Sequence, residues 1–267
     1  MEGGCGVRWM GQIHFQFRLL LGGEETLDFF CARITMKIAV EGNIGSGKST
    51  LMAAAKRMCR ESFEFFFEPL ETWHDLLHLY FQDPATWALP FTLEVLRSHD
   101  RVLEWDSSAR AGKKPHCVVE RSPHACRYVF SDILKHEGYL SADDMELVDK
   151  YFRMFAWTPD VVVLVDVEPH VCSERIAARG RDGEAPSYDY LRCIQYYYDK
   201  MLHSTLQRVP VYRLIQGSSE SKEAFHARFA LLLENLIREA GAPQSRAGPR
   251  REGSSAPPRG SRGSGPR

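Results

Sequence analysis

The feature that most limits what this chain can fold into is residues 42–49, Gly-Asn-Ile-Gly-Ser-Gly-Lys-Ser, which fit the pattern G-x-x-x-x-G-K-[ST] of a phosphate-binding loop. Residues 37–40 predict a short buried strand before it, and residues 50–60 predict a helix after it. Glycines let successive backbone N–H groups point into one concavity, and the start of a helix adds partial positive charge. The loop therefore predicts a nucleoside triphosphate site. A chance glycine turn is disfavoured because all fixed positions and both flanks match.

The residues of this loop have expected parts in the site. The Lys48 ammonium can reach the β- and γ-phosphates of ATP, and the Ser49 hydroxyl can bind Mg²⁺. ATP and Mg²⁺ are thus the expected cofactors. The predicted cofactor-binding residues are Gly42, Asn43, Ile44, Gly45, Ser46, Gly47, Lys48, Ser49 and Thr50.

Composition favours one α/β domain of about 200 residues with tails, since the 267 residues are 44% apolar and 26% charged. A net charge of −1 implies no general attraction to nucleic acid or to a membrane surface. No apolar run reaches the roughly 18 residues of a membrane span. The seven cysteines form no C-x-x-C pair, so we expect reduced thiols in an intracellular protein.

The domain is expected at residues 36–240. Residues 1–35 mix arginine with acidic residues, which disfavours a transit peptide and leaves an extension outside the core fold. Residues 241–267 are rich in Gly, Pro, Ser and Arg and predict a disordered tail.

Four further segments, 62–67, 116–119, 161–165 and 209–215, predict strands that alternate with helices. This alternation predicts an α/β fold of the P-loop NTPase type, a five-stranded parallel sheet with helices on both faces. The helices are expected at 75–106 with breaks or kinks at Pro84 and Pro90, and at 125–135, 142–155, 171–179, 188–206 and 222–240.

Carboxylates follow three of these strands, at Glu68, Glu120 and Asp166. The carboxyl ends of parallel strands face the ligand crevice, so we expect Glu120 to bind the metal ion. Asp166 is a second candidate, for which a strand-end role is favoured. Glu68 is expected in the crevice with Trp73 as its wall, although a solvated turn residue and a core tryptophan fit the local sequence equally well.

Three arginines, Arg175, Arg179 and Arg181, predict an arginine-rich lid. The first two share a helix face because they are four residues apart. Guanidinium groups beside a triphosphate can offset charge in the transition state. A solvated basic helix end is the alternative.

These motifs occur together and in order with Glu68-Pro69-x-x-x-Trp73, Asp83-Pro84-x-x-Trp87, and Glu120-Arg121-Ser122 followed by Arg127-Tyr128. Over residues 36–240 the combination resembles the deoxynucleoside kinase family, which includes deoxycytidine, deoxyguanosine, mitochondrial-type thymidine and viral thymidine kinases. The resemblance implies phosphoryl transfer from ATP to the 5′-hydroxyl of a deoxynucleoside, a role in nucleotide salvage and a homodimer.

The resemblance also implies roles for individual residues. Glu68 matches the general base, and Arg121 matches the arginine that pairs with it. Glu120 and Ser49 match the magnesium shell, and Arg175, Arg179 and Arg181 match the lid, with Lys48 on the phosphates. Glu184 matches the glutamate that binds the 3′-hydroxyl, and the aromatic residues around the base are Trp73, Phe91 and Phe130.

Three positions depart from the family pattern. Thr92 replaces a glutamine that reads the base edge, so a water or a neighbour such as His99 must take over that contact. Phe81 replaces the tyrosine near the 3′-hydroxyl, unless Tyr80 takes that role by a shift of one residue. Cys126 stands where deoxycytidine kinases have aspartate, which leaves room for a 5-methyl group and favours thymidine or broad pyrimidine use.

Other interpretations remain open from the sequence. A thymidylate kinase also carries a P-loop and a Glu-Pro strand end, but Glu120-Arg121-Ser122 fits nucleoside kinases better. A non-catalytic nucleotide-binding subunit of a heterodimer is a second alternative, supported by Thr92 and Phe81. A GTPase is disfavoured because the chain has no Asn-Lys-x-Asp motif. We expect a cytoplasmic protein, with mitochondrial or host-nuclear locations left open.

Overall fold

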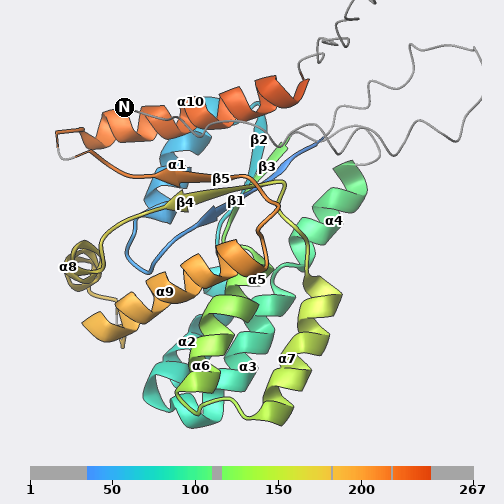
Figure 1. The fold of residues 1–267 in the computed structure, drawn as a ribbon, viewed down its shortest axis with the longest axis vertical. Helices are drawn as coiled ribbons and strands as arrows, with labels where there is room; N and C mark the ends of the chain where they lie inside the picture. The colour runs from blue at the N-terminus through green and yellow to red at the C-terminus, as the bar shows by residue number, and fades with distance from the viewer. Residues whose placement is uncertain (1–34, 110–115, 182, 218, 242–267) are drawn as a thin grey trace, which may run out of the picture.

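The computed structural model describes residues 35–109, 116–181, 183–217 and 219–241. Its sheet consists of five parallel strands in the order β2-β3-β1-β4-β5, so the predicted fold class is confirmed (Figure 1). The strands are β1 (Lys37–Glu41), β2 (Phe63–Phe66), β3 (His116–Glu120), β4 (Val161–Val165) and β5 (Val211–Leu214).

The helices follow the strands in the expected alternation. They are α1 (Lys48–Cys59), α2 (Leu70–Gln82), α3 (Pro84–Arg97), α4 (Asp100–Ala109), α5 (Pro123–Ala125), the π-helical turn η1 (Cys126–Phe130), α6 (Ser131–His136), α7 (Ala142–Phe155), α8 (Pro169–Arg179), α9 (Tyr188–Ser204) and α10 (Lys222–Gly241).

Strand β1 lies at the centre of the sheet, where both of its faces are covered. Successive side chains of a strand point to opposite faces. Ile38 and Val40 pack on the side of α1 and α10, whereas Ala39 packs on the side of α5 and α9. All three are fully buried, which explains why the strand is continuously apolar. The same position brings the loop after β1 to the middle of the sheet's carboxyl edge.

The segment predicted as one interrupted helical stretch forms three helices, α2 to α4. Pro84 occupies the first turn of α3, where its missing N–H costs no intrahelical bond. The Asp83 side chain accepts a hydrogen bond from the Thr86 N–H at 3.3 Å and so caps this helix. Helix α3 continues through Pro90, so of the expected break or kink the structure excludes a break.

The predicted extension at 1–35 and tail at 241–267 fall almost entirely outside the described residues. Among the helices that the structure does describe, none is both long and apolar enough to cross a membrane.

Helix α7 begins at a capping box, which gives a stability prediction. The Ser141 hydroxyl accepts a hydrogen bond from the Asp144 N–H at 3.2 Å, and the Asp144 carboxylate accepts one from the Ser141 N–H at 2.8 Å. We expect Ser141→Ala to lower the free energy of unfolding by about 0.5–2 kcal/mol, measured by urea denaturation. The control Ser204→Ala changes an exposed serine at the end of α9 and should stay within about 0.5 kcal/mol of wild type. Equal effects of the two changes would contradict a capping role.

Candidate active site

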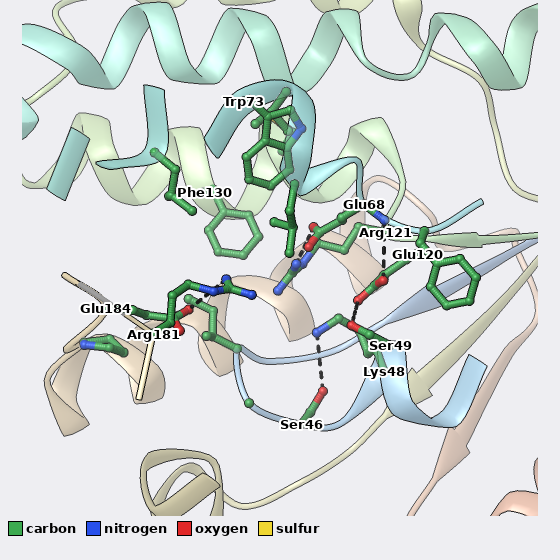
Figure 2. Close-up of a pocket in the computed structure, with 18 of the residues that line it drawn as sticks. Ser46, Lys48, Ser49, Glu68, Trp73, Glu120, Arg121, Phe130, Arg181 and Glu184 are labelled. Atoms are coloured by element: carbon green, nitrogen blue, oxygen red, sulfur yellow. Dashed lines mark hydrogen bonds and ion pairs between the residues drawn. The ribbon is translucent and has the colours of Figure 1, made fainter. Parts of the chain in front are cut away.

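A cavity of about 1170 Å³ opens at the carboxyl ends of β1, β2 and β3. Side chains from the P-loop, the two neighbouring strand ends and helices α2, α3 and α8 line it, together with the segment between α8 and α9 (Figure 2). Of the predicted site residues, it gathers Ile44, Gly45, Ser46, Gly47, Lys48, Ser49, Thr50, Glu68, Trp73, Tyr80, Phe81, Phe91, Thr92, Glu120, Arg121, Cys126, Phe130, Arg175, Arg179, Arg181 and Glu184.

Two glycines of the P-loop occupy positions that exclude side chains. Gly42 has φ of +141°, and a Cβ there would lie 2.5 Å from the Val165 carbonyl oxygen. Gly45 has φ of +76°, and its Cβ would lie 2.6 Å from the Cys172 carbonyl oxygen. The loop therefore packs tightly against β4 and α8, as a backbone phosphate cradle requires.

The Lys48 side chain is buried at the base of this loop. Its ammonium donates hydrogen bonds to the carbonyl oxygens of Gly42 at 3.0 Å and Asn43 at 2.7 Å. Burial and the nearby Arg121 charge lower the pKa of Lys48 to about 8, although Glu120 and Glu68 act in the opposite direction. The cost of burying this cation falls when a polyanion approaches it, so the position suits a phosphate ligand.

Oxygen ligands suitable for a divalent cation meet beside the loop. The Ser49 hydroxyl donates to the Glu120 Oε1 at 2.6 Å, and Glu120 Oε2 lies 3.5 Å from the backbone nitrogen of Glu68 (Figure 2). Within the described part of the chain, no group of three or more His, Cys, Asp or Glu side chains is placed to hold a metal. This pair of hard oxygen donors therefore fits Mg²⁺ bound partly by nucleotide phosphates and water.

Glu68 and Arg121 form an ion pair across the cavity from the P-loop (Figure 2). The Glu68 side chain is only 21% exposed, so the solvated-turn interpretation is not supported. Burial acts to raise the pKa of Glu68, but the charges of Arg121 and Lys48 outweigh it and hold the pKa below its usual value. The pKa of Arg121 is raised well above its usual value by Glu68, against the effect of burial. Both groups are therefore charged at neutral pH.

Aromatic rings form the opposite wall. Trp73 meets Phe91 edge to face with ring centroids 5.4 Å apart, and Phe91 stacks on Tyr80 at 5.3 Å with 17° between the planes. The Phe130 ring lies 5.1 Å from the Arg121 guanidinium. A slot between such rings suits a flat, stacked ligand.

Neutral polar groups line the inner end of this slot. Thr92 and His99 are buried, and the Cys126 thiol lies 3.7 Å from the Thr92 carbonyl oxygen. Burial, with the nearby Arg101 charge, lowers the pKa of His99 to about 3, so its ring is neutral at pH 7. Burial raises the pKa of Cys126 to about 12, so its thiol is protonated. Thr92, His99 and Cys126 thus offer hydrogen bonds without a charge of their own, beside the charged Arg101.

The three arginines after β4 differ in their contacts. Arg175 donates to the Ser46 carbonyl oxygen at 3.0 Å and so lies against the P-loop. Arg179 and Arg181 both pair with Glu184, the latter at 3.6 Å. Arg181 lies on the opposite side of the cavity from Lys48 (Figure 2). The i, i+4 spacing thus places Arg175 and Arg179 on one side of α8, as expected.

Phe81 and Tyr80 both line the cavity but face different neighbours. A Cβ on Gly183 would lie 3.0 Å from the Phe81 ring, so Phe81 lies directly under the turn that carries Glu184. Tyr80 is hydrogen-bonded to Tyr190, and burial raises the pKa of Tyr80 to about 12. Of the two side chains, the one that lies against Gly183 is therefore Phe81, which has no hydroxyl.

Some predicted residues lie elsewhere. Gly42 and Asn43 do not line the cavity, and the Asn43 amide donates instead to the Leu191 carbonyl oxygen of α9 at 2.8 Å. Asp166 forms an ion pair with Arg213 at 2.9 Å, outside the cavity, as its strand-end interpretation implies.

Arg101 and Tyr190 line the cavity although the sequence did not single them out. Arg101 donates to the Phe67 carbonyl oxygen and lies over the Phe66 ring. Arg101 comes two residues after His99, in a charged stretch of the sequence. Such a stretch looks the same as the solvated start of a helix, so no local signal marked Arg101 as a site residue.

Comparison with known proteins agrees with this geometry. The 029R protein of Invertebrate iridescent virus 3, described as a kinase, is 32% identical over 165 residues, covering 61% of this chain and 80% of that protein. The thymidine kinase of Ictalurid herpesvirus 1 is 31% identical over 176 residues, covering 62% of this chain and 73% of that protein. The deoxycytidine kinase of Rattus norvegicus is 26% identical over 215 residues, covering 67% and 82%.

The sequence model of the deoxynucleoside kinase family matches residues 38–236, which are more than half of the chain. This match spans the P-loop, both strand ends with their carboxylates, and the arginines after β4. The chain therefore belongs to the deoxynucleoside kinase family and is a nucleoside-phosphorylating kinase.

Proposed function

We propose that this protein transfers the γ-phosphoryl group of ATP to the 5′-hydroxyl of a deoxynucleoside, with a pyrimidine as the base. The observation that carries the proposal is the Glu68–Arg121 ion pair, which shares one cavity with the P-loop lysine and the Ser49–Glu120 pair. A base held opposite a phosphate-binding loop is what phosphoryl transfer to an alcohol needs.

Glu68 accepts the proton of the 5′-hydroxyl as the oxygen attacks the γ-phosphorus and the bond to the β-phosphate oxygen breaks. Arg121 keeps the Glu68 carboxylate ionised and contributes guanidinium donors to the 5′-oxygen. The Lys48 ammonium contacts the β- and γ-phosphates, where negative charge redistributes during transfer.

The residues that would hold Mg²⁺ are Ser49 and Glu120, whose oxygens already meet at 2.6 Å. These two side chains would hold Mg²⁺ beside the phosphates, where its charge would offset part of theirs. Arg175, Arg179 and Arg181 act as the lid that adds positive charge over the phosphates. Glu184, buried between two of these arginines, accepts a hydrogen bond from the 3′-hydroxyl.

The base is held between Trp73, Phe91 and Phe130, and its edge is read by Thr92 and His99. A threonine hydroxyl and a neutral imidazole each offer one donor and an acceptor. They can satisfy the N3–H and O4 of thymine or, with the hydroxyl and tautomer reversed, the N3 and amino group of cytosine. Thymidine is favoured because Cys126 is small and uncharged at the position that faces the 5-substituent.

Substitution of Cys126 tests this preference. We expect Cys126→Asp to lower kcat/KM for thymidine relative to deoxycytidine by about 10- to 200-fold, because a buried carboxylate excludes the methyl group. Cys126→Ala, which stays small and neutral, should keep the wild-type ratio. The ratio is measured with both nucleosides in competition for limiting enzyme. A ratio unchanged by the aspartate contradicts the placement of Cys126 at the 5-substituent.

The experiment that tests the function is ATP-dependent phosphorylation of each of the four deoxynucleosides and of thymidine monophosphate by the purified chain. The proposal expects a nucleoside monophosphate as product, fastest with thymidine. Activity on thymidine monophosphate alone identifies a thymidylate kinase instead. Binding of ATP without transfer to any acceptor identifies a non-catalytic subunit.

We also propose that the protein acts as a cytoplasmic homodimer with its kinase domain at residues 36–240. The family resemblance is what supports the homodimer. The five cysteines in the described residues are all unbridged, which suits a reducing compartment. Light scattering of the purified chain distinguishes a dimer from the 30.5 kDa monomer.

A further inference from the structure

A buried carboxylate, Glu41, ends strand β1 and has no part in the mechanism above. It is fully buried beneath the P-loop. Its Oε1 accepts a hydrogen bond from the Ser122 backbone N–H at 2.8 Å, and its Oε2 accepts one from the Tyr198 hydroxyl at 3.1 Å. A buried carboxylate is costly to maintain, so a carboxylate with two such partners calls for an explanation beyond packing.

Both partners of Glu41 are neighbours of Arg121: Ser122 follows it in the sequence, and the Tyr198 hydroxyl contacts its side chain. Arg121 has φ of +59° and is the one non-glycine residue with positive φ in the described part of the chain. This left-handed conformation is unfavourable for a residue with a Cβ and persists only where surrounding contacts impose it. The Arg121 N–H donates to the Val40 carbonyl oxygen at 3.0 Å, and the next N–H, of Ser122, donates to Glu41. The end of β1 thus binds the backbone on both sides of the strained residue.

The Arg121 side chain is held by the same cluster. Its Nε–H donates to the Tyr198 hydroxyl at 3.4 Å, while its NH1 pairs with Glu68. Tyr198 is 2% exposed and is packed in the core between α9 and the sheet, so its hydroxyl is a fixed point. Because that hydroxyl donates its proton to Glu41, its lone pairs are left to face the arginine.

The direction of the Tyr198 pKa shift agrees with its hydroxyl being the proton donor. Burial and the Glu41 charge raise the pKa of Tyr198, so the hydroxyl keeps its proton at neutral pH. Burial raises the pKa of Glu41, while the hydrogen bonds from Ser122 and Tyr198 and the Arg121 charge oppose that rise.

We propose that Glu41 and Tyr198 are positioning residues that set the Arg121 guanidinium against Glu68, with Tyr198 binding the arginine and Glu41 orienting the tyrosine hydroxyl and the backbone. The proposal rests on the proposed function, since it gives the Glu68–Arg121 pair its catalytic meaning. It assigns a role to the Glu41 carboxylate at the end of the central strand.

The test removes one hydroxyl and leaves the ring that fills the core. Tyr198→Phe should lower kcat by about 10- to 100-fold, because a small displacement of a group that holds the base is enough for such a loss. The Kd of a non-hydrolysable ATP analogue should stay within about twofold, since no P-loop contact changes. Tyr197→Phe is the matched control, because it removes the hydroxyl of the next residue on α9, whose ring lies near Lys200. It should leave both quantities at wild-type values.

A double-mutant cycle decides whether Tyr198 acts through Arg121. In an Arg121→Lys background the Nε–H is absent, so adding Tyr198→Phe should change kcat by less than about twofold. Glu41→Gln, which keeps the volume of the side chain, should lower kcat in the same direction. A wild-type kcat in Tyr198→Phe, or the same loss in both backgrounds, overturns the proposal.

A second readout does not need activity. The Arg121 Nε–H signal in a ¹⁵N-arginine spectrum, identified by its loss in Arg121→Lys, should be protected from solvent exchange in wild type and exchange faster in Tyr198→Phe. An exchange rate unaffected by the substitution overturns the positioning role. Absence of phosphorylation by the wild-type protein overturns the proposed function instead, while this signal still reports on the contact.

Discussion

Glu68→Gln is expected to lower kcat for nucleoside phosphorylation by about 10²–10⁴-fold, the usual contribution of a general base. The amide keeps the shape of the carboxylate but cannot accept the 5′-hydroxyl proton, and it replaces the ion pair with Arg121 by a neutral contact. Binding of an ATP analogue should persist, because Lys48 and the P-loop are unchanged. Steady-state kinetics and a binding titration together check this expectation.

The matched control for this variant is Glu71→Gln, the same change at an exposed position three residues further along the chain and outside the cavity lining. It should retain wild-type kcat. A Glu68→Gln enzyme with near-normal kcat contradicts the assignment of the base and leaves nucleotide binding as the supported activity. A loss of both kcat and analogue binding points to a disturbed fold, which circular dichroism detects.

Lys48→Met is expected to lower kcat/KM for ATP by about 10²–10³-fold. This is the usual loss when an enzyme loses one preorganised donor that faces negative charge developing in the transition state. Methionine retains the buried aliphatic stem but not the ammonium, which here donates to the carbonyl oxygens of Gly42 and Asn43. The loss should appear in kcat as well as in analogue affinity, because the lysine contacts phosphate oxygens whose charge changes during transfer.

Lys56→Met is the control for this prediction, because Lys56 lies on the exposed face of the same helix, with its ammonium 5.6 Å from the Phe67 ring centroid. We expect its kinetics to match wild type. If Lys48→Met bound the analogue normally and turned over at the wild-type rate, the P-loop would not be the phosphate site of this enzyme.

Local patterns in the sequence determined the fold to a large extent. Helix α7 was predicted with its observed bounds, and every strand was predicted to within two residues at each end. Strand patterns are local because burial on both faces requires continuous apolar runs, and the P-loop is local because its ligand is bound by consecutive backbone groups. The π-helical turn at Cys126–Phe130 was missed, and at Pro90, where a break or kink was expected, α3 has no break.

The candidate site was predictable where the motifs themselves carried it. Glu68, Glu120 and Arg121 follow strands, so parallel strand ends were enough to place them at one edge. The tertiary structure alone decided that Phe81 lies against Gly183, because that depends on how a turn before α9 meets helix α2. It also placed Asp166 with Arg213, outside the cavity.

The contacts of Arg121 show most clearly what the sequence determined and what the tertiary structure decided. The sequence by itself determined that a strand would end in Glu120-Arg121-Ser122 and that a carboxylate would end the strand before it. The resemblance to the family implied the pairing of Arg121 with Glu68, which the structure shows across 53 residues, but only the tertiary structure joined Tyr198 to Glu41, 157 residues away. The physical reason is that hydrogen bonds between distant residues depend on how the elements pack, whereas strand, loop and helix signals depend on neighbours along the chain.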